Sequence, residues 1–287
     1  METKSKAHLF AFLTAFIWGT TFVAIKKLQM HYNPSEIILC RFIIAYIVLL
    51  LIKPKRLNHV SFRENIIFMA AGLTGVCLYF LLESMALSMS LASVVGVLVS
   101  VGPIFTALIT CLVLRQGKLK LKFMSGLMVA LFGIIIVSIR GIDLNNSNWY
   151  GNILAVLAAL MWAIYSIISN KISQKYGDIL LCTRRVIFYG IIFLLIYNVG
   201  FKKIHFTIPD YSDVLFMSYL GVGASALCFI MWNFALNKLG PKKTSVYIYL
   251  VPVISIISSA IILRENINVV MVIGTICTLS GLAICEM

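Results

Sequence analysis

The chain has 287 residues, of which 61% are hydrophobic and only 12% are charged. An ordinary soluble domain carries roughly 25% charged residues, and a globular core of this length could not bury so much apolar surface. The mean hydropathy of +1.00 is typical of a protein whose solvent is lipid. The composition therefore excludes a soluble enzyme, a disordered chain and a small disulfide scaffold.

The net charge of +14 would suggest a nucleic-acid partner in a soluble protein. In a membrane protein with many spans, the short cytoplasmic loops collect Lys and Arg, and this explanation fits the composition better. We therefore expect the lipid bilayer and a small-molecule substrate as partners, no nucleic acid, and a monomer or homodimer.

Metal and disulfide chemistry has little support in the sequence. The seven cysteines lie inside apolar runs without a CxxC pair, and the four histidines are far apart along the chain. A metal site needs clustered ligands, and a disulfide framework needs a secreted context. We expect buried thiols, no metal site and no cofactor.

Hydrophobic segments of 16 to 23 residues recur along the chain. A helix needs about 20 apolar residues to cross the hydrocarbon layer, and each span must satisfy its own backbone hydrogen bonds. The first segment is too long for a signal-peptide core and lacks a clear cleavage site, so it is expected to be retained. The predicted spans are 7–25, 37–52, 65–87, 92–114, 123–139, 151–170, 179–200, 214–236, 244–263 and 267–285.

Basic residues alternate between the two sets of span ends. The set that contains both termini carries 15 of the 24 Lys and Arg residues, and the opposite set carries six. The positive-inside rule then places both termini in the cytoplasm of a multi-pass protein of the cell (plasma) membrane.

The two halves of the chain resemble each other in sequence. We expect one repeat over residues 1–143 and a second over 144–287. The matched positions are 11–18 with 155–162, 36–40 with 178–182, Pro103 with Pro252, and Gly126 and Gly133 with Gly274 and Gly281. Each repeat holds five spans, an odd number, so the repeats must cross the membrane in opposite directions. Inverted repeats are typical of secondary transporters that work by alternating access.

Several of these positions carry a family resemblance. They are Trp18-Gly19, Ala86-Leu87, Pro103 and Leu114 in the first half, and Ala235-Leu236, Gly240-Pro241, Pro252 and Leu263-Arg264-Glu265 in the second. In this pattern the chain resembles the EamA-type members of the drug/metabolite transporter superfamily, over nearly its whole length. The resemblance implies an all-α protein of ten transmembrane helices, arranged as two inverted five-helix repeats around a central cavity. It also implies small organic substrates, many of them exported amino acids, metabolites or drugs. Gln116 stands where the second half has Glu265, so a role of that acid is not carried to both halves.

Charged residues inside spans are expensive and are therefore candidates for function. Arg41 and Glu83 are predicted to form a gate pair or to clamp the two charges of a zwitterion. The alternatives are snorkelling to the headgroups or a static ion pair. Arg184 is the predicted repeat counterpart of Arg41, although the alignment gap leaves Arg185 as a second possibility.

Aromatic residues away from the membrane interfaces are candidate cavity walls. Trp18 and Trp162 fall near the middle of their spans, where an indole N–H needs a partner. The candidate substrate-binding residues are Trp18, Trp162, Tyr79, Tyr165, Trp232 and Tyr247. Helix packing is the alternative for each of them.

Proline and glycine positions suggest how the helices bend and pack. Pro103 and Pro252 each remove a backbone hydrogen bond within a span and predict kinks, either static or moving during transport. Seven span glycines predict close helix packing: Gly72, Gly75, Gly96, Gly126, Gly133, Gly274 and Gly281.

The sequence thus predicts a secondary transporter of small organic solutes, such as amino acids, amines or related metabolites, working by alternating access and in the direction of export. The alternatives are an intramembrane enzyme and a non-transporting receptor or scaffold. The zinc, paired-aspartate and nucleophile-elbow motifs of an enzyme do not occur, so we expect no enzymatic activity.

Overall fold

A computed structural model describes residues 2–57, 60–115, 121–140, 149–201, 209–240, 244 and 246–286, and this part of the chain is built from helices and short connections. The predicted repeat boundary at 143/144 lies outside these residues. The α-helices are α1 Glu2–Leu28, α2 Pro34–Ile52, α3 Phe62–Gly72, α4 Tyr79–Met89, α5 Ala92–Val99, α6 Gly102–Leu108, α7 Leu121–Arg140, α8 Trp149–Tyr176, α9 Ile179–Gly200, α10 Tyr211–Ser218, α11 Cys228–Leu239, α13 Leu250–Ser258 and α14 Val269–Glu286.

Short segments of other helix types join some of these helices into longer rods. They are the π-helical segments Leu73–Leu78, Ile109–Val113, Tyr219–Leu227 and Ser259–Leu263, and a 3₁₀ turn at Val246–Tyr249. The π-helical segments leave the chain helical while shifting the face that the following residues present. Segments 65–87 and 214–236, predicted as single spans, are therefore continuous rods with a change of winding in the middle.

Seven helices of the described part are long and apolar enough to cross a membrane. They coincide with the first four predicted segments and with segments 151–170, 179–200 and 214–236. Three shorter apolar helices, Leu121–Val137, Tyr247–Leu263 and Val269–Cys285, coincide with the remaining predictions. The all-helical membrane architecture is confirmed, and the number of ten crossings stays a prediction.

Polar side chains define where several helices begin. Ser61 accepts from the backbone N–H of Glu64, whose carboxylate accepts in return from the Ser61 N–H, as in a capping box. The Asp178 side chain similarly accepts from the Leu181 N–H at the start of α9. Such residues satisfy the orphan donors of the first helical turn.

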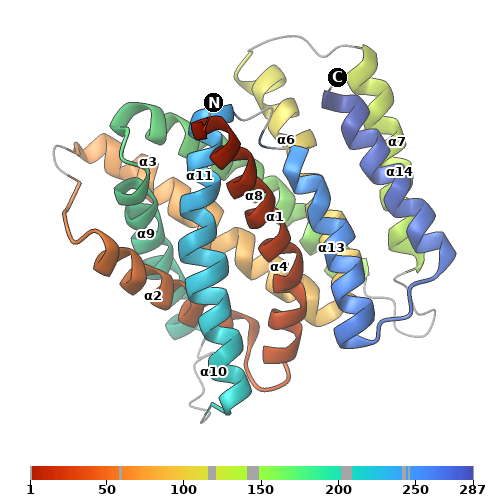
Figure 1. Ribbon diagram of the computed structural model, residues 1–287, viewed down its shortest axis with the longest axis horizontal. Coiled ribbons are helices and arrows are strands. Elements are labelled where there is room, and N and C mark those ends of the chain that lie inside the picture. The colour runs from red at the N-terminus through yellow and green to blue at the C-terminus, as the bar shows by residue number, and fades with distance from the viewer. Residues whose placement is uncertain are drawn as a thin grey trace.

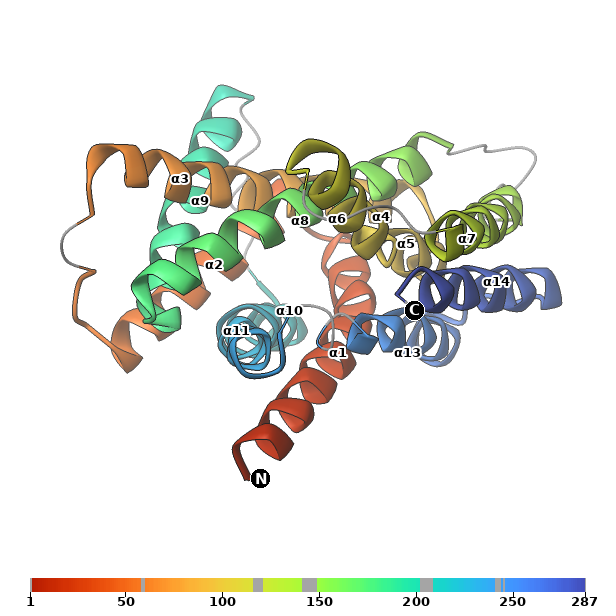
Figure 2. The ribbon, with the colours of Figure 1, turned by 90° about the horizontal axis from the view of Figure 1, so that it is seen from above.

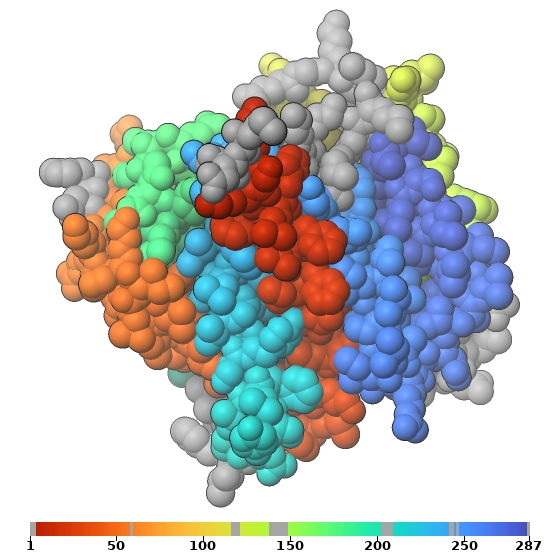
Figure 3. Space-filling model, viewed as in Figure 1, coloured from red at the N-terminus to blue at the C-terminus, as the bar shows by residue number. Residues whose placement is uncertain are grey.

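The helices form one bundle with two distinct edges. At one edge α2 and α3 pack against α9, and at the other edge α7 and α14 lie side by side (Figures 1 and 2). Helix α1 runs between α11 and α13 on the face shown in Figure 3. The start of α1 and the end of α14 lie at the same end of the bundle (Figure 1).

Glycines bring α7 and α14 into backbone contact, as the sequence predicted. A Cβ placed at Gly126 would lie 2.6 Å from the Gly281 carbonyl oxygen, and one at Gly133 would lie 2.6 Å from that of Gly274. These distances are well inside van der Waals contact, so the helices approach this closely only because side chains are missing at these positions.

Candidate functional site

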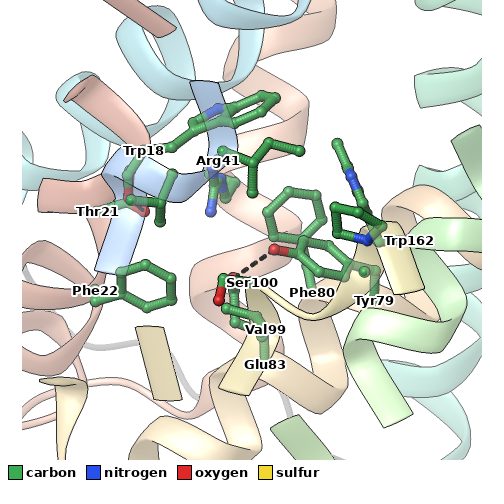
Figure 4. Close-up of a pocket in the computed structure, with 14 residues that line it drawn as sticks. Trp18, Thr21, Phe22, Arg41, Tyr79, Phe80, Glu83, Val99, Ser100 and Trp162 are labelled. Carbon is green, nitrogen blue, oxygen red and sulfur yellow. Dashed lines mark hydrogen bonds between the residues drawn. The ribbon is translucent and has the colours of Figure 1, made fainter. Parts of the chain in front are cut away.

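A cavity lies in the interior of the bundle, between helices of the first and second halves of the chain (Figure 4). Its volume is about 50 Å³, counted as space for the centres of water-sized molecules. Its walls are Trp18, Thr21, Phe22, Arg41, Tyr79, Phe80, Glu83, Val99, Ser100, Gly102, Pro103, Trp162, Ile248 and Val251. At roughly 10–15 Å³ for one water, this space holds a few waters, and a larger solute requires the walls to move.

Helix α1 supplies one wall from a single face. Trp18, Thr21 and Phe22 are three and four residues apart, a spacing that places side chains on one side of a helix. The Trp18 indole N–H donates to the Ala224 carbonyl oxygen at 3.1 Å, and the Thr21 hydroxyl donates to the Trp18 carbonyl at 2.7 Å. Trp18 thus has the N–H partner that a buried indole needs, and it comes from the second half of the chain.

Helix α4 places the carboxylate of the site. Glu83 is 3% exposed, and its Oε1 accepts from the Tyr79 hydroxyl at 2.8 Å. Tyr79 precedes Glu83 by one helical turn, so the hydroxyl and the carboxylate share the face that borders the cavity (Figure 4). The hydrogen bond holds Glu83 in one orientation.

Helix α2 supplies the cation. Arg41 is 1% exposed, and its Nε donates to the Ser225 hydroxyl at 2.7 Å. Its guanidinium carbon lies 4.5 Å from the centre of the Phe80 ring, a cation–π distance. Ser225 belongs to the π-helical segment Tyr219–Leu227 of the second half, so Arg41 bridges the two halves.

Arg41 and Glu83 border the same cavity without forming an ion pair, since no nitrogen–oxygen distance within 4.0 Å joins them in the described residues. Among the described residues of the cavity wall they are the only ones with ionisable acidic or basic side chains, so the wall carries one acidic and one basic group.

Five of the six aromatic candidates form one cluster, of which only part faces the cavity. Trp18 and Trp162 meet edge to face with ring centres 5.5 Å apart, and both line the cavity. Trp232 packs on Trp18 at 5.1 Å and Tyr165 packs on Trp162 at 5.1 Å, but both stand behind the wall. Trp232 and Tyr165 thus pack against the two indole rings that line the cavity and stabilise their orientation.

Of three other predicted residues, two lie outside the cavity wall and one lines it. Tyr247 lies outside the cavity wall, where its hydroxyl pairs with His8 Nδ1 at 2.8 Å. Arg184 also lies outside the wall, and its guanidinium donates to the carbonyl oxygens of Lys53 and Lys55 just after α2. Pro103 lines the cavity in the first turn of α6, directly after the break that follows α5.

Pro252 is buried in the first turn of α13 and follows the 3₁₀ turn at Val246–Tyr249. Each of the two prolines therefore lies in the first turn of a stretch of α-helix, where a backbone N–H has no partner within that stretch to lose.

The sequence prediction missed several wall residues, notably Thr21, Phe22, Phe80 and Ser100. Thr21 and Phe22 could have been found from the helical spacing to Trp18. Ser100 could not, because it follows α5 at a break in the helix that apolar periodicity does not reveal.

Ion pairs and helix caps close the bundle at its two ends. Glu265 accepts from the backbone N–H of Ala92 at 2.8 Å and from Ser93, at the start of α5, while Lys26 donates to the carbonyl of Leu87 at 2.7 Å. At the other end Lys53 pairs with Asp178. Partial burial opposes ionisation of Asp178, but the hydrogen bonds from Lys53 and from the α9 backbone lower its pKa below the usual value.

One group of described residues offers three possible metal ligands, since atoms of His31, Asp210 and Asp213 lie within 4.8 Å of one another. His31 Nδ1 lies 3.1 Å from both Asp213 oxygens, and the Asp210 N–H donates to Asp213 at 3.2 Å. These bonds tie the loop after α1 to the cap of α10, and helix capping accounts for the arrangement.

Comparison with known proteins assigns the chain to a family. The family model described as EamA-like transporter matches it twice, over residues 5–139 and 149–286. The chain belongs to the EamA-like transporter family. An uncharacterized transporter of Archaeoglobus fulgidus is 26% identical over 284 residues, which are 97% of this chain and 96% of that protein. An uncharacterized transporter of Clostridium kluyveri is 25% identical over 288 residues, covering 96% and 91%.

A solved structure described as "Crystal structure of protein" resembles this EamA-family chain with a TM-score of 0.70 and 17% identity, covering 98% of this chain and 96% of that one. That likeness shows the fold alone. Family membership, relatives named as transporters and the apolar helices together identify a multi-pass membrane transporter.

Proposed function

We propose that this EamA-family protein is a secondary transporter that exports small organic solutes, namely amino acids, amines or related metabolites, by alternating access. The observation that carries the proposal is the central cavity, in which Arg41 and Glu83 are held apart among aromatic walls. Buried charges inside membrane-spanning helices are a default sign of a substrate pathway. Small solutes bind in mostly apolar pockets with a few placed polar groups.

The contacts between helices support two inverted repeats of five helices. Helix α1 packs on α13 and α11, and its repeat counterpart α8 packs on α6 and α4. Helix α2 packs on the π-helical segment Tyr219–Leu227 of the second half, while α9 packs on the segment Leu73–Leu78 of the first half. Each contact thus has a partner with the two halves exchanged, as expected of a two-fold relation.

The packing of α7 on α14 supports the opposite direction of the repeats. Gly126 contacts Gly281 and Gly133 contacts Gly274, so the first glycine of each half meets the second glycine of the other. This reciprocal pairing is the pattern of antiparallel helices related by an axis across them. The contact between Trp18 and Trp162, which are equivalent positions, fits an axis close to the cavity.

The connections that precede α7 and α14 also agree in their backbone. A π-helical segment precedes Arg115 in the first half and Arg264 in the second, and both residues adopt left-handed backbone with φ of 54° and 55°. Non-glycine residues seldom adopt this conformation, so its occurrence at repeat-related positions is a specific similarity.

We further propose that the protein lies in the plasma membrane with both termini in the cytoplasm and crosses the membrane ten times. An even number of crossings is consistent with chain ends at one end of the bundle (Figure 1). The excess of basic residues in the loops at that end supports the orientation.

Counterflow in proteoliposomes tests the transport function. Vesicles loaded with an unlabelled solute should accumulate the labelled solute from outside, for at least one member of a panel of amino acids, amines and nucleosides. Glu83→Gln is the matched inactive variant, because it keeps the size of the side chain and removes its charge. If no solute shows counterflow in a folded preparation, a non-transporting receptor or scaffold replaces the transporter.

A further inference from the structure

Arg41 is held at three of its sides and left open at the fourth. The Nε atom donates to Ser225, the face of the guanidinium packs on Phe80, and a second ring, that of Phe42, lies 5.4 Å away. These contacts come from three different helical segments. They fix the direction in which the remaining donors point.

The open side of Arg41 is its Nη1 nitrogen. Within the described part of the chain Nη1 is buried and has no hydrogen-bond partner. A guanidinium remains charged in proteins, so it cannot avoid the cost of this unsatisfied donor by losing its proton. Arg41 lines the cavity, which is where a partner for Nη1 can be accommodated (Figure 4).

Glu83 does not serve as that partner. Its carboxylate lies beyond ion-pair distance of Arg41 and accepts the Tyr79 hydroxyl instead. The cavity therefore presents an unmatched charged donor at one wall and a separately anchored carboxylate at another. A ligand oxyanion at Nη1 would form a charge-assisted hydrogen bond in a water-poor site, where such bonds are strong.

We propose that the solute carries a carboxylate, and that Arg41 Nη1 is its anchor. This inference rests on the proposed transport function, and it narrows that proposal: amino acids and carboxylic acids are substrates, while simple amines are not. An amine without a carboxylate would bring a second positive charge beside a buried guanidinium and leave Nη1 unsatisfied. The aromatic walls formed by Trp18, Phe22 and Trp162 would hold the apolar part of the solute.

Two matched series of probes test the charge requirement on the unmodified full chain. One consists of alanine, propionate, propionamide and ethylamine, and the other of phenylalanine, 3-phenylpropionate, 3-phenylpropionamide and phenethylamine. Binding is measured as the ligand-dependent rise in the thermal unfolding temperature of the purified protein in detergent. We expect stabilisation by carboxylates in at least one series and none by the corresponding amide or amine. Comparing amino acid with plain acid shows whether the carboxylate must be part of a zwitterion.

Variants assign the effect to Arg41. Arg41→Lys keeps the charge but loses the planar fork, and should weaken carboxylate binding about tenfold to hundredfold, the range for a hydrogen bond to a charged group. Ser225→Ala keeps Arg41 and frees its Nε, so it should weaken binding less and serves if Arg41→Lys does not fold. Arg185→Lys is the control, because Arg185 also has an unpartnered buried nitrogen but lies outside the cavity wall.

The proposal is overturned if the amide or amine of a series binds as tightly as its carboxylate. It is equally overturned if no carboxylate binds, or if the Arg41 and Ser225 variants both bind like the unmodified chain. Counterflow with the same probes separates this inference from the transport function. Carboxylate binding without flux removes transport and keeps the anchor, whereas counterflow of amines keeps transport and removes the anchor.

Discussion

The contact between α7 and α14 can be broken by a single methyl group, at Gly281. A Cβ there would lie 2.3 Å from the backbone nitrogen of Ala130 and 2.6 Å from the carbonyl oxygen of Gly126. Ordinary carbon contacts begin near ~3.5 Å, so the overlap exceeds about 1 Å. Both opposing atoms belong to the backbone, so no change of rotamer relieves the overlap and the helices must separate.

The size of the effect follows from two opposing contributions. Overpacking of this kind costs about 1–3 kcal/mol, while replacing glycine by alanine within a helix gains up to about 1 kcal/mol. Gly200→Ala, at the last residue of α9, is the reference for a glycine-to-alanine change without overlap, because a Cβ at Gly200 meets nothing within 4 Å. Relative to Gly200→Ala, we expect Gly281→Ala to lose about 1–3 kcal/mol of stability, or roughly 2–12 °C in unfolding temperature at about 2–4 °C per kcal/mol.

Thermal unfolding of the two full-length variants in detergent measures this difference. No described side chain of α7 or α14 lines the cavity, so Gly281→Ala should retain ligand affinity at temperatures where it is folded. Equal unfolding temperatures for Gly281→Ala and Gly200→Ala would refute the close approach of α7 and α14. Loss of ligand affinity in a folded Gly281→Ala protein would refute the separation of this interface from the cavity.

Three further predictions concern the cavity and the ends of the bundle. Glu83→Gln should lower the counterflow rate more than about tenfold, which corresponds to the loss of one charge-assisted hydrogen bond, while the unfolding temperature stays unchanged. A flux equal to that of the unmodified protein would remove Glu83 from the mechanism. Trp18→Phe should raise the half-saturation concentration for transport about threefold to tenfold, because the cavity wall loses apolar area and the hydrogen bond to Ala224. Trp149→Phe, at an exposed position, is the control and should leave that concentration unchanged. If the two variants have the same half-saturation concentration, Trp18 serves helix packing. The lowered pKa of Asp178 stabilises the fold fully above the unfolded pKa near ~3.9, and this contribution is lost as pH falls through the lower folded value. Asp178→Asn should remove that part of the acid sensitivity, measured as the pH dependence of the unfolding temperature. The effect is less than about 1 kcal/mol, because the ion pair with Lys53 is partly exposed to solvent.

The sequence predicted best what lipid and helix geometry determine locally. Apolar runs marked the helices because every span must bury its backbone polar groups, and glycines marked close packing because only they allow it. The contact between Trp18 and Trp162 could also have been predicted, since equivalent residues of the proposed repeats would meet only near an axis that relates them. These features depend on spacing along the chain.

Contacts between the halves could not be predicted in this way. Ser225 became the partner of Arg41 because a π-helical segment turns it toward α2, and such a segment has no apolar signature of its own. Tyr247 was expected in the cavity, but the 3₁₀ turn that precedes α13 puts its neighbour Ile248 in the wall and pairs Tyr247 with His8. In both cases a local change of winding decides which face a residue occupies.

The two repeats contribute unequally to the cavity, and this inequality has a consequence for the solute. Arg41, Tyr79 and Glu83 all come from the first half, whereas the second half supplies Trp162, Ile248 and Val251. By the offset that aligns Ala86 with Ala235, the position of Glu83 corresponds to Trp232 in the second half. The two proposed repeats share their helix contacts, whereas the charges of the described cavity wall come from the first half alone.

A solute with one polar and one apolar end would therefore bind in a single orientation, with its charged group toward the first half. Each in-span charge costs roughly 2.5–3.5 kcal/mol on insertion scales, and packing alone could be supplied by apolar side chains. A scaffold that places both charges of the described cavity wall in its first half, and leaves one guanidinium donor open, is better explained by ligand binding than by the stability of the fold.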